Sequence, residues 1–124
     1  MARHNITGRW GENAAVEHLV LKGYDIVERN WRLDHLEIDI VARHGQRIVF
    51  VEVKTRTDRD DDDPRRLISQ RKLSNMHRCA TAYMQRYNLN FSAQFDIIII
   101  TGTPADYKLD HYPDAYFPPM KTYR

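Results

Sequence analysis

The sequence predicts an α/β fold in which a mixed sheet of four to five strands is flanked by helices. Segments 14–22 and 73–87 repeat apolar residues at the three- and four-residue spacing of helices. Two apolar runs around a short polar turn occupy 37–54, and a β-branched run follows at 95–102. Because a strand, a helix and a buried strand in succession imply a parallel connection, the sheet should contain both strand orientations.

Length and composition indicate one domain that spans residues 1–124. The 124 residues are 42% hydrophobic, which is enough for one core but not for two ordinary domains. No apolar run is long enough to cross a bilayer, and the N-terminal residues lack the layout of a signal peptide, so we expect a cytoplasmic protein. Cys79 is the only cysteine, which excludes an internal disulfide, and the six histidines lack the paired spacing of a zinc site.

The first expected elements are a helix and a strand. Asn5 or Thr7 can cap the helix, and Gly23 can end it just after Lys22. The strand follows in the segment "YDIVERNWR", residues 24–32.

The next two expected strands form a hairpin within "EIDIVARHGQRIVFVEVK", residues 37–54. The reversal falls at His44-Gly45-Gln46-Arg47, where Gly45 can adopt the positive φ of a type II′ turn. A two-residue hairpin is therefore the simplest connection between the two runs.

The second half of the chain predicts a helix, a buried strand and a tail. Pro64 can sit in a first helical turn and Ser69 can cap a helix that ends near Asn88. The run "FDIIIITG", residues 95–102, is typical of a strand covered on both faces. Residues 103–124 form a proline-containing tail that can add an edge strand around "LDHYPDAY".

The net charge of +2 conceals a basic segment. Residues 64–95 contain no aspartate or glutamate, and their basic residues are Arg65, Arg66, Arg71, Lys72, Arg78 and Arg86. This segment can bind a polyanion or can simply be a solvated surface, and charge alone favours the solvated surface.

The hairpin register brings acidic residues together. If Gly45 and Gln46 form the tip, Asp39 faces Glu52 and Glu37 faces Lys54, with all four on one face of the sheet. Facing β-carbons lie about 5 Å apart, close enough for Asp39 and Glu52 to share one cation. Two crowded carboxylates repel each other and lose hydration, a conflict that a divalent ion would remove.

Oxygen ligands favour Mg²⁺ or Mn²⁺, and Lys54 could stabilise negative charge on a phosphate. This interpretation predicts metal-assisted phosphodiester hydrolysis. In the alternative interpretation, the four charged residues face solvent and Glu37 pairs with Lys54 across the strands. Ile48 and Phe50 share the parity of Glu52, so the face is apolar at one end and charged at the other. The residues alone leave both interpretations open.

Asp39 followed by Glu52-Val53-Lys54 resembles the PD-(D/E)XK nuclease signature. The wider segments "GRWGENAAVEHLVLKGYDIVERNWR", "EIDIVAR" and "IVFVEVKTR" resemble the YraN-like bacterial family of predicted endonucleases, which is related in fold to archaeal Holliday junction resolvases. The resemblance is detailed over the first half of the chain and looser beyond it. It implies a restriction endonuclease-like three-layer fold, Asp39 and Glu52 as ligands of Mg²⁺ or Mn²⁺, and Lys54 as the catalytic lysine.

The resemblance also assigns roles around this centre. It implies that Glu12 from the first helix joins the catalytic residues, although a glutamate near a helix N-terminus is also favoured by the helix dipole. We expect Glu37 to support the site by pairing with Lys54, and the alternative is that it acts as a second metal ligand. The expected nucleic-acid contacts are Arg56, Gln70, Arg71 and Lys72. The sequence departs from the family pattern at Leu36, which replaces a glycine, and in the acidic run Asp60–Asp63, which would repel phosphate.

We therefore predict a nucleic-acid-binding protein with a metal-dependent endonuclease site that acts on structured or damaged DNA. Modules that read a fixed sequence, such as a zinc finger or a helix-turn-helix, are not found. One alternative is a nucleic-acid-binding module without catalysis, and another is an adaptor whose basic helix binds an acidic partner. By analogy with junction-cleaving relatives, a homodimer could use Tyr112, Tyr116 and Phe117.

Overall fold

The computed structural model is an α/β fold with a five-stranded mixed sheet between two helices. It describes residues 2–57 and 68–115, with side chains from residue 9 onward. The elements in chain order are α1 (Ala2–Leu21), β1 (Asp25–Leu33), β2 (Leu36–His44), β3 (Arg47–Arg56), α2 (Gln70–Arg86), β4 (Ser92–Thr103) and β5 (Asp106–Tyr112). The strands lie in the order β1-β2-β3-β4-β5.

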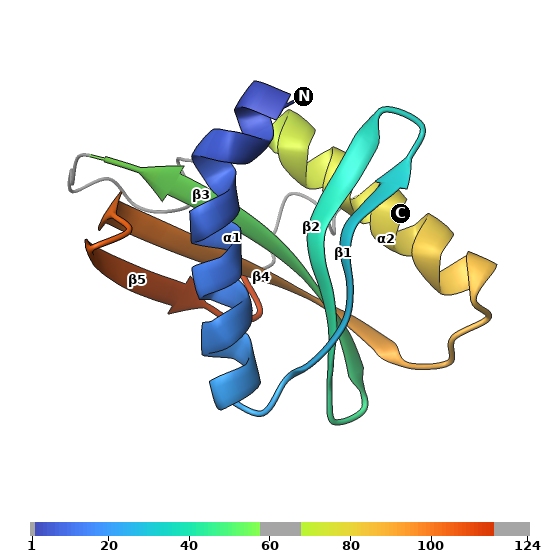
Figure 1. Ribbon diagram of the computed structural model, residues 1–124. Helices are drawn as coiled ribbons and strands as arrows, with labels where there is room; N and C mark the ends of the chain where they lie inside the picture. The colour runs from blue at the N-terminus through green and yellow to red at the C-terminus, as the bar shows by residue number, and fades with distance from the viewer. Residues whose placement is uncertain (1, 58–67, 116–124) are drawn as a thin grey trace.

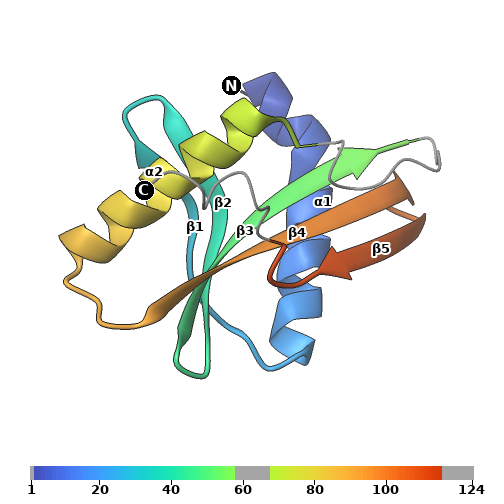
Figure 2. The same cartoon turned by 180° about the vertical axis from the view of Figure 1, so that it is seen from behind.

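The arrangement of layers confirms the predicted fold class. β3 and β4 are parallel, and the other neighbouring pairs are antiparallel. Figure 1 shows α1 in front of the twisted sheet, and Figure 2 shows α2 on the opposite face. The fold is consistent with the restriction endonuclease-like architecture. Within the described residues, no helix is long and apolar enough to cross a membrane.

The start predicted for the first helix is wrong, whereas its end is confirmed. α1 begins at Ala2, before both suggested caps, Asn5 and Thr7. A cap needs a non-helical backbone, and no proline or glycine among residues 2–6 enforces one. At the other end, the N–H of Tyr24 donates to the carbonyl of Leu19 at 2.9 Å, and Gly23 has a φ of +94°.

The hairpin between β2 and β3 has the predicted turn and register. Gly45 has a φ of +63°, and the pairs run from His44 with Arg47 to Ile40 with Val51. In each pair the residue numbers add up to the same total as predicted from the sequence. The glycine turn and the alternating apolar residues therefore determine this register.

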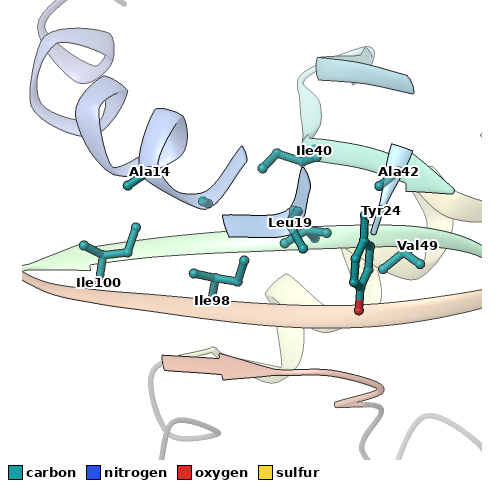
Figure 3. Close-up of a cluster of buried hydrophobic side chains, with 10 residues drawn as sticks. Ala14, Leu19, Tyr24, Ile40, Ala42, Val49, Ile98 and Ile100 are labelled. Atoms are coloured by element: carbon teal, nitrogen blue, oxygen red, sulfur yellow. The ribbon is translucent and has the colours of Figure 1, made fainter. Parts of the chain in front are cut away.

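α2 and β4 also match their sequence patterns. Ser69 caps α2, because its Oγ accepts a hydrogen bond from the N–H of Lys72 at 3.1 Å. In β4, Ile97 to Ile100 are each at most 2% exposed. Ile98 and Ile100 pack on the α1 side, where Figure 3 shows them in one cluster with Ala14 and Leu19 of α1, whereas the other two isoleucines of the run pack on the α2 side.

The last strand, β5, pairs antiparallel with β4 and begins earlier than the segment 109–116 on which the sequence suggested an edge strand. The acidic run, Pro64, the two arginines that follow it, Tyr116 and Phe117 lie outside the described residues.

Asp96, in β4, is a buried hub that joins several elements. It is 0% exposed, and its carboxylate accepts hydrogen bonds from Tyr24, His111, Gln94 and the backbone N–H of Asp114 at 2.8–3.0 Å. Burial raises the pKa of such a carboxyl, but these hydrogen bonds outweigh burial and hold it below its ordinary value. The hub therefore anchors β5 and the following turn to β4.

Gly11 allows α1 to approach β3 closely. A β-carbon built at this position would lie 2.3 Å from the Oγ1 of Thr55. Thr55 lies in β3 directly after Lys54, so this contact sets how near α1 lies to Glu52 and Lys54. A side chain at position 11 therefore requires the Thr55 side chain to rotate or the helix and the strand to move apart.

We expect Gly11→Ala to lower the free energy of unfolding by about 1–2 kcal/mol, because the clash outweighs the gain in helix propensity. Urea denaturation measures the loss. Thr55→Ala removes the Oγ1 atom. Gly11→Ala should therefore lower the free energy of unfolding less in the Thr55→Ala protein than in the wild type. A Gly11→Ala protein as stable as the wild type would show that the approach is not tight.

Candidate functional site

A cleft of about 1180 Å³ lies between α1, the ends of β1 to β3 and the start of α2. Its lining is rich in charge. The charged lining residues are Arg9, Glu12, Arg29, Arg32, Glu37, Asp39, Glu52, Lys54 and Lys72. The structure therefore brings the four predicted acidic residues and the predicted lysine of the site into one cleft.

Asp39 takes the place of a backbone partner at the end of the β2–β3 ladder. The last backbone pair is Ile40 with Val51. Two residues further along β3, the N–H of Val53 donates to the Oδ2 of Asp39 at 2.8 Å. Burial raises the pKa of Asp39 to about 6, although the bond from Val53 opposes the shift. The carboxylate is thus fixed at the point where the two strands separate.

Glu52 is the most constrained acid of the cleft. The residue is 8% exposed, and its Oε2 lies 3.5 Å from the Nζ of Lys72. Its Oε1 is buried and has no hydrogen-bond partner among the described residues. Burial raises the pKa of Glu52 to about 8, and the charge of Asp39 adds to the shift. A buried oxygen without a partner, beside a second carboxylate, is an arrangement that a cation would stabilise.

Contrary to what the residue numbers had predicted, the side chains of β2 do not alternate regularly between the two faces of the sheet. Ile40 packs with the α1-side cluster, as expected, but Ile38 packs with Val41 in the α2-side cluster. The change of face occurs at Asp39. In the neighbouring strand it coincides with Asn30, which has a left-handed φ of 55°. Glu37 therefore does not share a face with Glu52, contrary to the register prediction.

This change of face explains where Glu37 lies. The β1–β2 register places Arg32 directly opposite Glu37, and their side chains are 3.8 Å apart. The expected ion pair between Glu37 and Lys54 is absent from the described part of the chain. Lys54 is exposed at the cleft, and its charge lowers the pKa of Glu52 only as the last of several effects.

Glu12 is held by β1 at the rim of the cleft. Arg29 donates to its Oε1 at 2.7 Å, and Asn30 donates to its Oε2 at 2.8 Å. The negative charge of Glu12 nonetheless raises the pKa of Asp39. Within residues 2–57 and 68–115, no three acidic, histidine or cysteine side chains are arranged to hold a metal ion. Asp39 and Glu52 are the two acidic residues of the cleft whose carboxyl pKa is raised by burial.

The predicted nucleic-acid contacts lie in two places. Arg56 is the last residue of β3, and it donates to the Oγ1 of Thr101 at 3.1 Å. Gln70 and Arg71 are exposed on the first turn of α2, and Lys72, on the same turn, lines the cleft.

The contact of Lys72 with Glu52 was not predicted, and neither was the role of Arg29 and Asn30. Sequence spacing could not show the Lys72 contact, because it depends on where α2 crosses the sheet. The position of Lys72 just after the Ser69 cap was the only local signal.

Comparison with known proteins gives consistent matches over most of the chain. A model of the family described as "Uncharacterised protein family UPF0102" matches residues 11–100. A UPF0102 protein of Bacteroides thetaiotaomicron is 41% identical over 120 residues, which is 97% of this chain and 99% of the relative. A UPF0102 protein of Christiangramia forsetii is 36% identical over 117 residues, or 94% and 98% of the two chains.

We expect the stability of the metal-free protein to fall as pH rises from about 5 to about 8. In this range the folded protein keeps a proton on Glu52 that the unfolded chain has lost, because burial raises the pKa of Glu52 above its ordinary value. Urea unfolding in the presence of a chelator measures the slope. Glu52→Gln should flatten it, whereas Glu17→Gln, at an exposed carboxylate of α1, should not. Stability that rises with pH over this range would contradict the assignment.

Proposed function

The chain belongs to the uncharacterised protein family UPF0102, which confirms the resemblance to the YraN-like family, and we propose that it is a Mg²⁺- or Mn²⁺-dependent endonuclease. The names of the relatives describe no activity, so the proposal rests on the cleft. The observation that supports it best is the buried Oε1 of Glu52, which lacks a partner among the described residues and lies near the half-buried Asp39. In a folded protein such an oxygen usually has a hydrogen-bond partner, and a bound cation is one explanation when it has none.

The donor set of the cleft fits a hard divalent cation. Asp39 and Glu52 would hold the ion through carboxylate oxygens, as Mg²⁺ and Mn²⁺ prefer. The ion would polarise a phosphodiester and favour attack by water. The chain itself fixes both carboxylates, one through the N–H of Val53 and the other through burial on β3.

The basic residues around the carboxylates support a nucleic acid as the substrate. Arg9, Arg32 and Lys54 line the same cleft as the acidic pair. Cations that contact a phosphate backbone bind it and orient it, but they do not read a base sequence. We therefore propose structured or damaged DNA as the substrate, with Arg56, Gln70 and Arg71 as outer contacts. A homodimer acting in the cytoplasm would suit a branched substrate.

Lys54 has a separate role in the proposed reaction. Its side chain is exposed at the cleft and is not held by the acidic pair, so it can contact a phosphate oxygen. An ammonium at this point stabilises the negative charge that develops on the phosphate during hydrolysis.

One contact favours a second candidate function, a nucleic-acid-binding module without catalysis. Lys72 already lies 3.5 Å from Glu52 and supplies positive charge to the acidic pair. If this ion pair were permanent, the cleft would bind a backbone without needing a metal. The two functions differ in whether cleavage depends on Asp39.

We expect Asp39→Asn to reduce cleavage of branched or nicked DNA at least about 100-fold while binding is retained. The amide keeps an oxygen that can accept the bond from Val53 but removes the negative charge that a metal needs. Gel assays with Mn²⁺ measure cleavage, and fluorescence anisotropy measures binding. Asp110→Asn, on β5, provides the control. DNA binding without cleavage by the wild type, with either metal and across varied DNA forms, would favour the non-catalytic module.

Lys54→Met should slow cleavage by about 100-fold or more and change Mn²⁺ affinity little, because the ammonium acts mainly in the transition state. Single-turnover rates and Mn²⁺ titration separate these two effects. Loss of Mn²⁺ binding in this variant would show that Lys54 supports the metal site instead.

A further inference from the structure

We infer that Lys72 is the counter-ion of Glu52 in the metal-free protein when Glu52 is ionised, and that a divalent metal and the Lys72 ammonium compete for this carboxylate. The inference rests on the proposed function, since it concerns the same acidic pair. It adds a residue from α2 and a means by which metal loading changes the cleft.

The contact of Lys72 with Glu52 involves only one of the two carboxylate oxygens. The Nζ of Lys72 lies 3.5 Å from the Oε2 of Glu52, a distance longer than a strong charge-assisted hydrogen bond. The other oxygen, Oε1, is buried and has no partner among the described residues. Lys72 therefore neutralises the carboxylate without satisfying it, which leaves Glu52 able to accept a better cation.

The two side chains differ in how easily they can move. The Glu52 side chain is 10% exposed, whereas the Lys72 side chain is 40% exposed. The backbone of Lys72 is fixed, because its N–H donates to the Oγ of Ser69 and the next residue, Leu73, is buried. The ammonium can thus leave while its helix stays in place.

The charge balance favours exchange over joint occupancy. Asp39 and Glu52 carry two negative charges when both are ionised, and Lys72 neutralises one of them. A divalent ion alone neutralises both, so the ion together with Lys72 would leave an excess positive charge beside the buried side chain of Glu52. Like charges at such short distance repel strongly where burial limits screening.

Exchange would give the cleft a second property. Lys72 lines the cleft, so an ammonium released from Glu52 remains beside the surface that meets the phosphate backbone. Metal binding would then strengthen the contact with the substrate as well as complete the acidic site. The protein would hold nucleic acid best when it is loaded with metal.

Mn²⁺ titration by calorimetry or by electron paramagnetic resonance, at a pH at which Glu52 is ionised despite its raised pKa, tests the competition without any activity measurement. We expect Lys72→Met to bind Mn²⁺ about tenfold more tightly than the wild type, because the metal no longer has to displace an ion pair. Arg71→Met is the matched control, since it removes the same charge from the same exposed turn, and it should change affinity by less than about threefold.

A second measurement follows the ammonium directly. Amine acetylation of the wild-type protein, quantified by mass spectrometry, should rise severalfold at Lys72 when Mg²⁺ is added. Lys22, at the end of α1, should not change. This readout does not depend on the fold of a variant.

The outcomes separate this inference from the proposed function. If the wild type binds Mn²⁺ and Lys72→Met binds it no better than Arg71→Met does, Lys72 is not a competitor and the metal site stands. If neither the wild type nor Lys72→Met binds Mn²⁺, both the inference and the proposed metal-dependent function fail. Binding by Lys72→Met alone would support the competition most strongly.

Discussion

The structure of the cleft depends on one hydrogen bond, in which a side-chain carboxylate accepts from a backbone N–H in place of a backbone carbonyl. At the end of the β2–β3 ladder, the N–H of Val53 is satisfied by Asp39. This bond allows the strands to separate without leaving a backbone group unpaired. It also fixes a negative charge in a buried place, beside Glu52. The raised pKa of each carboxyl, caused mainly by burial, reflects the cost of that arrangement.

The three layers supply one part of the cleft each. The sheet provides the acidic pair, α1 provides Glu12 close to Asp39, and the first turn of α2 provides Lys72. The approach of α1 is possible because Gly11 has no side chain to meet Thr55. The position of Lys72 follows from the Ser69 cap, which sets where α2 begins. Local features with ordinary structural roles thus determine which charges meet.

Local signals predicted most of the fold. The Gly45 turn predicted the hairpin register, and the isoleucine run predicted a strand buried on both faces. The change of face at Asp39 could not be predicted, because an asparagine with positive φ, such as Asn30, looks the same in sequence as one in a regular strand. The acidic residues were therefore placed in the right cleft, but Glu37 was assigned the wrong partner. The contact of Lys72 depends on the path of a whole helix and has no local pattern.

The Asp96 hub lies on the opposite side of the sheet from Glu52 and has a consequence for solubility. β5 covers the outer edge of β4, whose isoleucines would otherwise present a long apolar strand for pairing with other molecules. Separation of β5 from β4 would remove the partners His111 and Asp114 from the carboxylate of Asp96, which is 0% exposed in the folded protein. The electrostatic cost of losing these partners keeps β5 paired with β4. The apolar run of β4 is thereby protected from aggregation.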